Sequence, residues 1–413
     1  MTSRREAFAA LAHRNFRLLW MGQLVSFAGS MMQATAVLWH VSMLVPPERK
    51  AIALGLVGLA RVVPLVGFSL FAGVIADALD RRRLMLVTQA CMACSAGLLA
   101  LLAFRGLTHV WPIYLLTATS FAAGSFDAPA RQSLVPNLVP PERLANALSL
   151  NTWMMQMGAV AGPALAGPVI AIGGVAWAYA INAASFVAVI VALLLMRDVP
   201  LREAGTAAKV SLRSAGEGLR FVFTHPLIRS TMLLDFVATF FGSATALLPI
   251  FAQDVLHVGA HGYGLLAAAP AAGAVLAGAA MVRLSDRIER RGAVLLWAVA
   301  GYGAATVLFG LSRWFWVSLA CLALTGVADT VSMVLRNIVR QGSTPDRLRG
   351  RMTSVNMLFF MGGPQLGELE AGAVASWIGA PLSVVTGGVA CVLATAAAGW
   401  TSAMLRRHRR ETP

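Results

Sequence analysis

Long apolar runs, separated by short polar and charged stretches, recur along the whole 413-residue chain. A helix needs about 18 to 20 consecutive apolar residues to cross the hydrocarbon core of a bilayer, and most of the runs are longer than that. The pattern predicts twelve spanning helices, at residues 17–45, 51–76, 84–104, 110–131, 146–171, 174–196, 228–253, 262–284, 292–311, 314–337, 350–376 and 380–404. We interpret the basic N-terminal stretch MTSRREAFAALAHRNFRLLW as a cytoplasmic tail, because it contains neither a short apolar core nor a small-residue cleavage site.

Composition strengthens this interpretation. Hydrophobic residues make up 58% of the chain and charged residues 12%, with a mean hydropathy of +0.72. Soluble domains carry about a quarter charged residues, so the composition indicates a membrane protein.

Positive charge alternates from one inter-helix loop to the next. The two tails and every second loop hold 28 of the 33 arginines and lysines, and cytoplasmic loops are the ones that carry such an excess. We therefore expect both termini in the cytoplasm. The preference for arginine over lysine indicates a GC-rich bacterial genome, so we expect the chain in the inner membrane of a bacterial cell. The net charge of +15 is spread over short loops, which favours contact with anionic lipid over binding of nucleic acid.

The longest polar interruption, residues 197–220, separates six predicted helices from six. It predicts an N-terminal six-helix bundle at 1–196, a cytoplasmic linker at 197–227 and a C-terminal six-helix bundle at 228–413. The two halves match in sequence. Asp77 and Arg81 after the second helix correspond to Asp286 and Arg290, 209 residues later, and Asp127 corresponds to Asp329 at an offset of 202.

These residues resemble the major facilitator superfamily over essentially the whole chain. Gly73, Asp77, Arg81 and Arg82 match the family pattern G-x-x-x-D-R-x-G-R-R/K after the second helix, although Ala78 and Asp80 depart from it. The stretch FDAPARQSLVPNLVPPERLANALSL is similar to the branch that contains the enterobactin exporter and macrolide efflux proteins. A pattern of drug and proton antiporters on the fifth helix is matched by Gly158, Gly162 and Pro163, which favours export.

The resemblance implies a gate. In the family, the aspartate after the second helix meets a helix N-terminus in the other bundle, and nearby arginines meet an acid on the fourth helix. Asp77 would then face the start of the eleventh helix, and Arg81 or Arg82 would reach Asp127. Such a contact is worth about 0.3 to 1 kcal/mol, which suits a latch that must open in every cycle. Alternatively, these residues only fix the orientation of the chain.

Ionisable residues inside the spans are functional candidates because each costs about 2.5 to 3.5 kcal/mol to insert. Arg61 on the second helix and Glu368 on the eleventh lie at similar depths, roughly 24 and 28 Å from the cytoplasmic side at 1.5 Å per residue. We hypothesise that Arg61 pairs with Glu368 or Glu370, and that protonation of the glutamate releases the arginine. The alternative is that Glu370 lies at the outer interface and Arg61 pairs within its own bundle.

Two further acids lie in the second half. Asp235, on the seventh helix, is a candidate for binding a proton or a cationic substrate; the alternative is a salt bridge to Arg229 or to a loop arginine. Asp329, expected near the inner end of the tenth helix, is seven residues from Arg336, so the two share a helical face. They mirror Asp127 and Arg131, and we interpret both pairs as gate networks.

The sequence carries no enzyme motif. Neither of the two lysines belongs to a phosphate-binding loop, and the four cysteines lie in apolar spans without the ligands of a metal site. We expect no cofactor and no metal, and a monomer is sufficient for this architecture. We predict an all-α membrane protein of two pseudo-symmetric six-helix bundles that acts as a secondary transporter. It would exchange protons for the export of a small amphipathic molecule, either a siderophore or a drug. The alternatives are a proton-coupled importer of a small metabolite, or a membrane-embedded sensor or enzyme.

Overall fold

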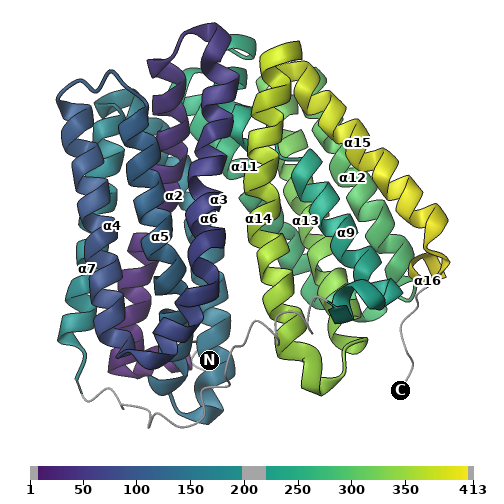
Figure 1. Cartoon of the computed structure of the whole chain (residues 1–413), viewed down its shortest axis with the longest axis horizontal. Coiled ribbons are helices and arrows are strands. Elements are labelled where there is room, and N and C mark those ends of the chain that lie inside the picture. The colour runs from purple at the N-terminus through teal and green to yellow at the C-terminus, as the bar shows by residue number, and fades with distance from the viewer. Residues whose placement is uncertain (1–7, 198–219, 408–413) are drawn as a thin grey trace. The chain divides into compact units, whose positions relative to one another are not determined.

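A computed structural model describes residues 8–197 and 220–407 of the chain. Within α3 and α14 it leaves out the side chains of residues 69–74 and 76–78 and of several residues between 346 and 361. Every regular element in the described ranges is a helix, and no strand occurs there (Figure 1). Ten of the described helical segments are long and apolar enough to cross a membrane. The structure therefore confirms the predicted all-α membrane fold.

The chain divides into two compact units. Unit 1 comprises Met1–Leu44 and Ala60–Val210, and unit 2 comprises Val45–Leu59 and Ser211–Pro413. The first part of α3 belongs to unit 2 because Gly55 and Gly58 leave no room for a Cβ beside the backbone of α14. The domain bounds 1–196, 197–227 and 228–413 stay a prediction, and most of the expected linker lies outside the described residues.

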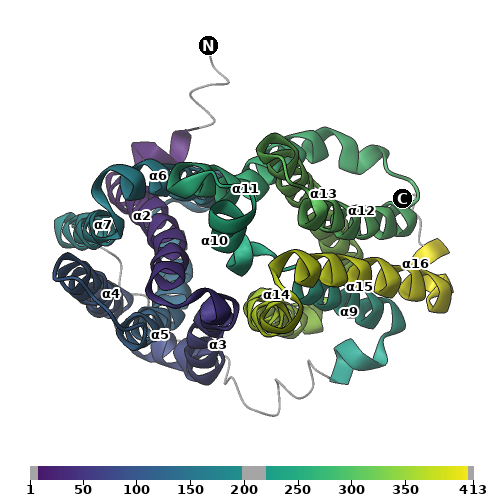
Figure 2. The same ribbon diagram turned by 90° about the horizontal axis from the view of Figure 1, so that it is seen from above.

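Unit 1 is built from helices that match the first six predicted spans, and in Figure 2 several of them are seen nearly end-on. The helix α2 packs on α6 and α7, and α4 packs on α5 and α7. Its core includes Phe16, Met85 and Val189, all fully buried. The helices are α2 (Arg14–Leu44), α3 (Pro47–Ala78, from Ala60), α4 (Arg81–Phe104), α5 (Trp111–Leu134), α6 (Leu144–Gly173) and α7 (Val175–Leu195).

Unit 2 holds the helices of the second half of the chain. The helix α13 packs on α11 and α12, α12 packs on α15, and α14 packs on α9. The helices are α9 (Pro226–Phe241), α10 (Leu248–Ile250), α11 (Gly259–Leu284), α12 (Arg291–Leu311), α13 (Phe315–Gly342), α14 (Asp346–Ile378), α15 (Ala380–Thr401) and α16 (Ala403–Arg407).

The seventh predicted span, 228–253, is not one continuous helix. It ends as α9 at Phe241, and the chain resumes as the short α10 and a π-helix at Phe251–Val255. Gly242 caps α9, and a Cβ at Gly242 would collide with the ring of Tyr302. Pro249 lies in the first turn of α10, where the missing amide hydrogen of a proline is tolerated. The break therefore follows from residues that the apolar pattern does not reveal.

Two glycines join helices at matching places of the two halves. Gly174 lies between α6 and α7 with φ +83°, and Gly379 lies between α14 and α15 with φ +86°. Only glycine adopts this combination of positive φ and extended ψ without strain. The two positions are 205 residues apart, close to the offset of the sequence repeat.

Candidate functional site

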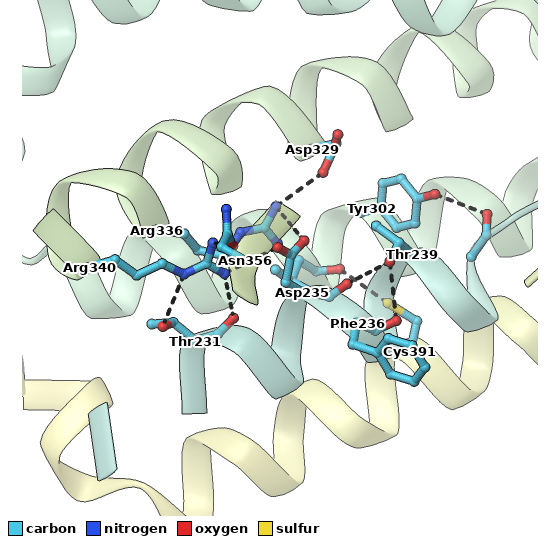
Figure 3. A network of polar contacts seen from close by, with 12 residues as sticks. Thr231, Asp235, Phe236, Thr239, Tyr302, Asp329, Arg336, Arg340, Asn356 and Cys391 are labelled. Atoms are coloured by element: carbon cyan, nitrogen blue, oxygen red, sulfur yellow. Dashed lines mark hydrogen bonds and ion pairs between the residues drawn. The ribbon is translucent and has the colours of Figure 1, made fainter. Parts of the chain in front are cut away.

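The buried centre of unit 2 is an ionic cluster between α9 and α13. Arg336 Nη2 lies 2.9 Å from Asp235 Oδ1, and Arg340 Nη2 lies 3.1 Å from Asp235 Oδ2. All three side chains are at most 4% exposed. Arg340 follows Arg336 by four positions, so both project from one face of α13 toward the single carboxylate of α9 (Figure 3). We call these residues, together with Asp329, the ionic cluster.

Hydrogen bonds extend the ionic cluster on both sides. Arg336 Nη2 also lies 3.5 Å from Asp329 Oδ1, so the pairing expected from their spacing is present. On the other side, Arg340 donates to the carbonyl of Thr231 at 3.2 Å and to the side-chain oxygen of Asn356 on α14. Two acids and two arginines make the cluster electrically neutral as a whole.

The salt-bridge partners of Asp235 are two arginines within the membrane-spanning helix α13. On sequence grounds, the alternative for Asp235 was a salt bridge to Arg229 or to a loop arginine. The structure shows a salt bridge, and its partners are Arg336 and Arg340, which were counted among the loop charges but lie within α13. The reason is helical spacing, because α9 and α13 pack side by side and bring the three groups together. A carboxylate paired with two buried cations is poorly suited to bind a proton or a cationic substrate.

Arg336 is incompletely satisfied. Its Nε and Nη1 atoms are buried and have no hydrogen-bond partner among the described residues, and its 2.9 Å contact with Asp235 Oδ1 lacks the alignment of a hydrogen bond. Buried donors without partners cost about 1 to 3 kcal/mol each, and more when charged. The cluster is thus better suited to fix the packing of α9 on α13 than to add net stability.

Asp329 lies in the middle of its helix rather than near the inner end. The tenth span was predicted to end at residue 337, but α13 runs from Phe315 to Gly342. Arg336 and Arg340 are buried within α13, whereas sequence reasoning counted both among the loop charges. At 1.5 Å per residue, Asp329 lies about 20 Å from either end of α13.

Unit 1 carries a counterpart of the ionic cluster in which the acid and the arginine have uncharged hydrogen-bond partners. Asp127 on α5 is 6% exposed, and its Oδ1 accepts hydrogen bonds from Thr88 Oγ1 at 3.0 Å and from Gln89 Nε2 at 2.9 Å. Arg131 donates to Gln23 Oε1 on α2 at 3.0 Å. The acid and the arginine of unit 1 therefore use uncharged partners.

The loop arginines take backbone partners in place of Asp127. Arg81 donates to the carbonyl of Ser133 at 3.3 Å, and Arg82 donates to the carbonyls of Leu193 at 2.8 Å and Leu194 at 3.2 Å. These carbonyls belong to the last turns of α5 and α7, which have no partner within their own helices. The family resemblance implied that Arg81 or Arg82 contacts Asp127. In the structure, Arg81 instead caps the end of α5 and Arg82 caps the end of α7.

The remaining gate candidates lie in α3 and just before α12. Gly73 and Asp77 lie in the part of α3 whose side chains are outside the described structure. Asp286 lies in the short turn before α12, and the exposed Arg290 immediately precedes that helix.

The fifth-helix motif has a packing role. A Cβ on Gly158 would lie 2.6 Å from the ring of Phe27, and one on Gly162 would lie 2.6 Å from the carbonyl of Ala28. Both glycines therefore let α6 approach α2 closely, and Pro163 lies between them and the end of α6.

The proposed coupling residues are buried or half-buried. Arg61 is 6% exposed, donates to the carbonyl of Ala34 at 3.4 Å and lies 5.8 Å above the ring of Phe121. On α14, Glu368 is 4% exposed and Glu370 is half-buried.

Sequence reasoning missed Arg340, Thr231 and Asn356. The four-residue spacing of Arg336 and Arg340 was a usable signal, because two arginines on one helical face indicate a shared anion. Within the described ranges, no group of three or more His, Cys, Asp or Glu side chains could hold a metal ion.

Long apolar helices that carry buried charged residues are typical of a multi-pass membrane protein. Here those residues form the ionic cluster of unit 2 and the contacts of Asp127 and Arg131 in unit 1. The family described as "transmembrane secretion effector" matches residues 5–411, and the chain belongs to that family of the major facilitator superfamily.

Curated relatives and solved structures agree with this. The chain is 26% identical to the enterobactin exporter EntS of Citrobacter koseri over 404 residues, covering 97% of this chain and 95% of that protein. It is 27% identical to EntS of Escherichia coli O1:K1 over 350 residues, covering 83% and 81%. A bacterial homolog of the human lysosomal transporter Spinster, in an inward-facing and unoccupied conformation, matches with a TM-score of 0.74 at 16% identity, covering 97% of this chain and 99% of that one. A bacterial homologue of the iron transporter ferroportin matches with a TM-score of 0.68 at 16% identity, covering 96% and 99%.

Proposed function

We propose that the chain is a proton-coupled exporter of a small amphipathic molecule, of the siderophore or drug class, that works by alternating access. The observation that carries this proposal is the full-length likeness to enterobactin exporters, which covers 97% of the chain and hence both units. The likeness to bacterial exporters supports a location in the bacterial inner membrane, and the distribution of arginine supports cytoplasmic termini.

The repeat supports alternating access. Transporters of this architecture move two related halves around a central site, so each half must be a compact body of its own. The division into two units and the matching glycine joints at Gly174 and Gly379 are consistent with such bodies.

Glu368 is our candidate for the proton carrier. It is 4% exposed and lies in the interior of α14, where a carboxylate is costly unless it is paired or protonated. Depth along the sequence makes Arg61 the group that Glu368 would hold in one transport state and release on protonation. Asp235 is the weaker candidate because two arginines already neutralise it.

The test is uptake by inverted membrane vesicles that contain the full chain. A panel of catecholate siderophores and lipophilic cationic drugs is offered with and without an imposed proton gradient. We expect at least one compound to accumulate only with the gradient, and a protonophore to abolish the accumulation. Absence of gradient-dependent uptake for every compound would contradict export of these classes and favour import.

Coupling is tested with the variant Glu368→Gln. We expect it to exchange labelled for unlabelled substrate across the membrane without a gradient, but to lose gradient-driven accumulation, because a glutamine cannot take up a proton. Glu370→Gln tests the neighbouring acid, and the exposed Glu142→Gln controls for loss of one negative charge. Accumulation at the wild-type level in Glu368→Gln would exclude this residue as the proton carrier.

A further inference from the structure

A partly open cavity lies among the helices of unit 2, beside the ionic cluster. It has a volume of about 240 Å³, and its walls come from the break after α9 and from α11, α12 and α13. Leu248, Phe309 and Leu322 contribute apolar surface. Asp329 is the charged residue of the wall, and its side chain is 43% exposed although it lies in the middle of α13.

The polar groups of this wall offer acceptors. The hydroxyl of Tyr302 donates to the carbonyl of Gly242 at 3.0 Å, which Figure 3 shows as a dashed line. Thr306 donates to the carbonyl of Tyr302 at 2.9 Å, and Thr325 donates to the carbonyl of Leu322 at 2.6 Å. A hydroxyl has one proton and two lone pairs, so each of these three groups has only lone pairs left for a ligand. Thr245 is the fourth hydroxyl of the wall.

Asp329 is the less tightly held acid of the ionic cluster. Arg336 lies 3.5 Å from Asp329 but 2.9 Å from Asp235, so one guanidinium is shared and the closer contact goes to Asp235. A carboxylate in an apolar surrounding is costly unless a cation approaches it. The cavity side of Asp329 therefore has negative charge available to a ligand.

We propose that this cavity binds a small organic cation, with the ammonium group on Asp329 and the apolar body against Phe309 and its neighbours. An ammonium carries three hydrogen-bond donors and no acceptor, which complements a wall of lone pairs. Pockets for drug-sized ligands enclose about 300 to 1,000 Å³, so a cavity of this size takes an amine with one ring or a short alkyl chain. The carboxylate of Asp329 disfavours an anionic ligand at this wall.

The inference goes beyond the proposed export of siderophores or drugs. It concerns equilibrium binding inside one unit, and it requires neither a proton gradient nor a particular cargo. Its failure would leave the vesicle experiment untouched, and failure of export would leave this binding site in place.

The test is calorimetric titration of the purified full chain in detergent. The probes are primary ammonium ions from ethylammonium to 4-phenylbutylammonium, compared with 2-phenylethanol and 3-phenylpropionate as neutral and anionic analogues. We expect saturable binding of at least one ammonium ion and none of the analogues. Absence of binding by every ammonium ion, or equal binding of the alcohol, would overturn the proposal without the use of any variant.

Variants then locate the site. Asp329→Asn keeps the side-chain volume and removes the charge, so the affinity for the best ammonium ion should fall by about tenfold to a hundredfold. Ala267→Leu places a larger side chain in the cavity wall and should abolish binding while Asp329 stays in place. Glu289→Gln removes one exposed negative charge from the same unit and should leave the affinity unchanged. Wild-type affinity in both Asp329→Asn and Ala267→Leu would overturn the assignment.

Discussion

The two units place an arginine against a different kind of acceptor at matching points of the repeat. In unit 1, Arg131 on α5 donates to the amide oxygen of Gln23 on α2. In unit 2, Arg336 on α13 contacts the carboxylate of Asp235 on α9, which a second arginine, Arg340, also contacts. Asp235 follows Gln23 by 212 residues and Arg336 follows Arg131 by 205, near the offsets of the sequence repeat.

Both units therefore have a polar contact of an arginine at corresponding positions of the repeat. The acceptor is an uncharged amide in unit 1 and a carboxylate in unit 2. An amide oxygen compensates the charge of Arg131 only in part, so its removal takes away one hydrogen bond and no ion pair. The carboxylate of Asp235 lies between two buried arginines, and its removal leaves those two cations with Asp329 as the remaining acid of the ionic cluster. Unit 2 is therefore the half in which a single charge change has a large effect.

Asp235→Asn is the strongest test of this difference. The variant leaves Arg336 and Arg340 buried beside a neutral amide, and we expect the free energy of unfolding to fall by about 3 to 5 kcal/mol. The measurement is unfolding of the protein in mixed detergent micelles by titration with sodium dodecyl sulfate. Glu289→Gln, an exposed acid of the same unit, is the matched control for the loss of one negative charge. A loss under about 1 kcal/mol would show that water reaches the arginines and that the cluster is not sealed.

The helices could be predicted from the sequence because each requires only a long apolar run. The pairing of Asp329 with Arg336 could be predicted as well, because seven residues return to the same face of one helix. The pairing of Asp235 with Arg336 and Arg340 could not, since it depends on the rotation of α9 relative to α13. Apolar residues surround both helices in the sequence and leave that rotation undetermined.

The positions of arginines near helix ends were also not predictable from the sequence. Arg340 and Arg82 both follow or precede apolar runs, and composition alone assigns both to loops. In the structure Arg340 is 2% exposed inside α13, whereas Arg82 caps the carbonyls of Leu193 and Leu194 at the end of α7. The cavity beside Asp329 was equally hidden, because it depends on the break in the seventh span at Gly242.

Gln23→Glu would give unit 1 the acceptor that unit 2 has. Gln23 Nε2 has no hydrogen-bond partner among the described residues, so the glutamate removes an unsatisfied donor and gives Arg131 a charged acceptor. Burial of the new carboxylate opposes this gain. We expect a net stabilisation of about 1 kcal/mol in the same unfolding titration.

The isosteric Gln23→Met serves as the control for this variant. It removes the acceptor and should destabilise the protein, because Arg131 then loses its partner on α2. If Gln23→Glu were destabilising as well, the cost of a buried carboxylate would outweigh the ion pair, and the neutral contact of unit 1 would be the more stable solution at that position.

Asp127→Asn should have the smallest effect of the three changes. One oxygen of Asp127 accepts both hydrogen bonds, from Thr88 and Gln89, and an asparagine offers an oxygen at the same position. No arginine or lysine of the described structure lies within 4.0 Å of this carboxylate to lose an ion pair. We therefore expect a change in the free energy of unfolding below about 1 kcal/mol, whereas Asp127→Ala, which removes both hydrogen bonds, should cost about 1 to 3 kcal/mol. A loss for Asp127→Asn as large as that for Asp235→Asn would mean that the charge of Asp127 is stabilising, and the contrast between a neutral unit 1 and an ionic unit 2 would then fail.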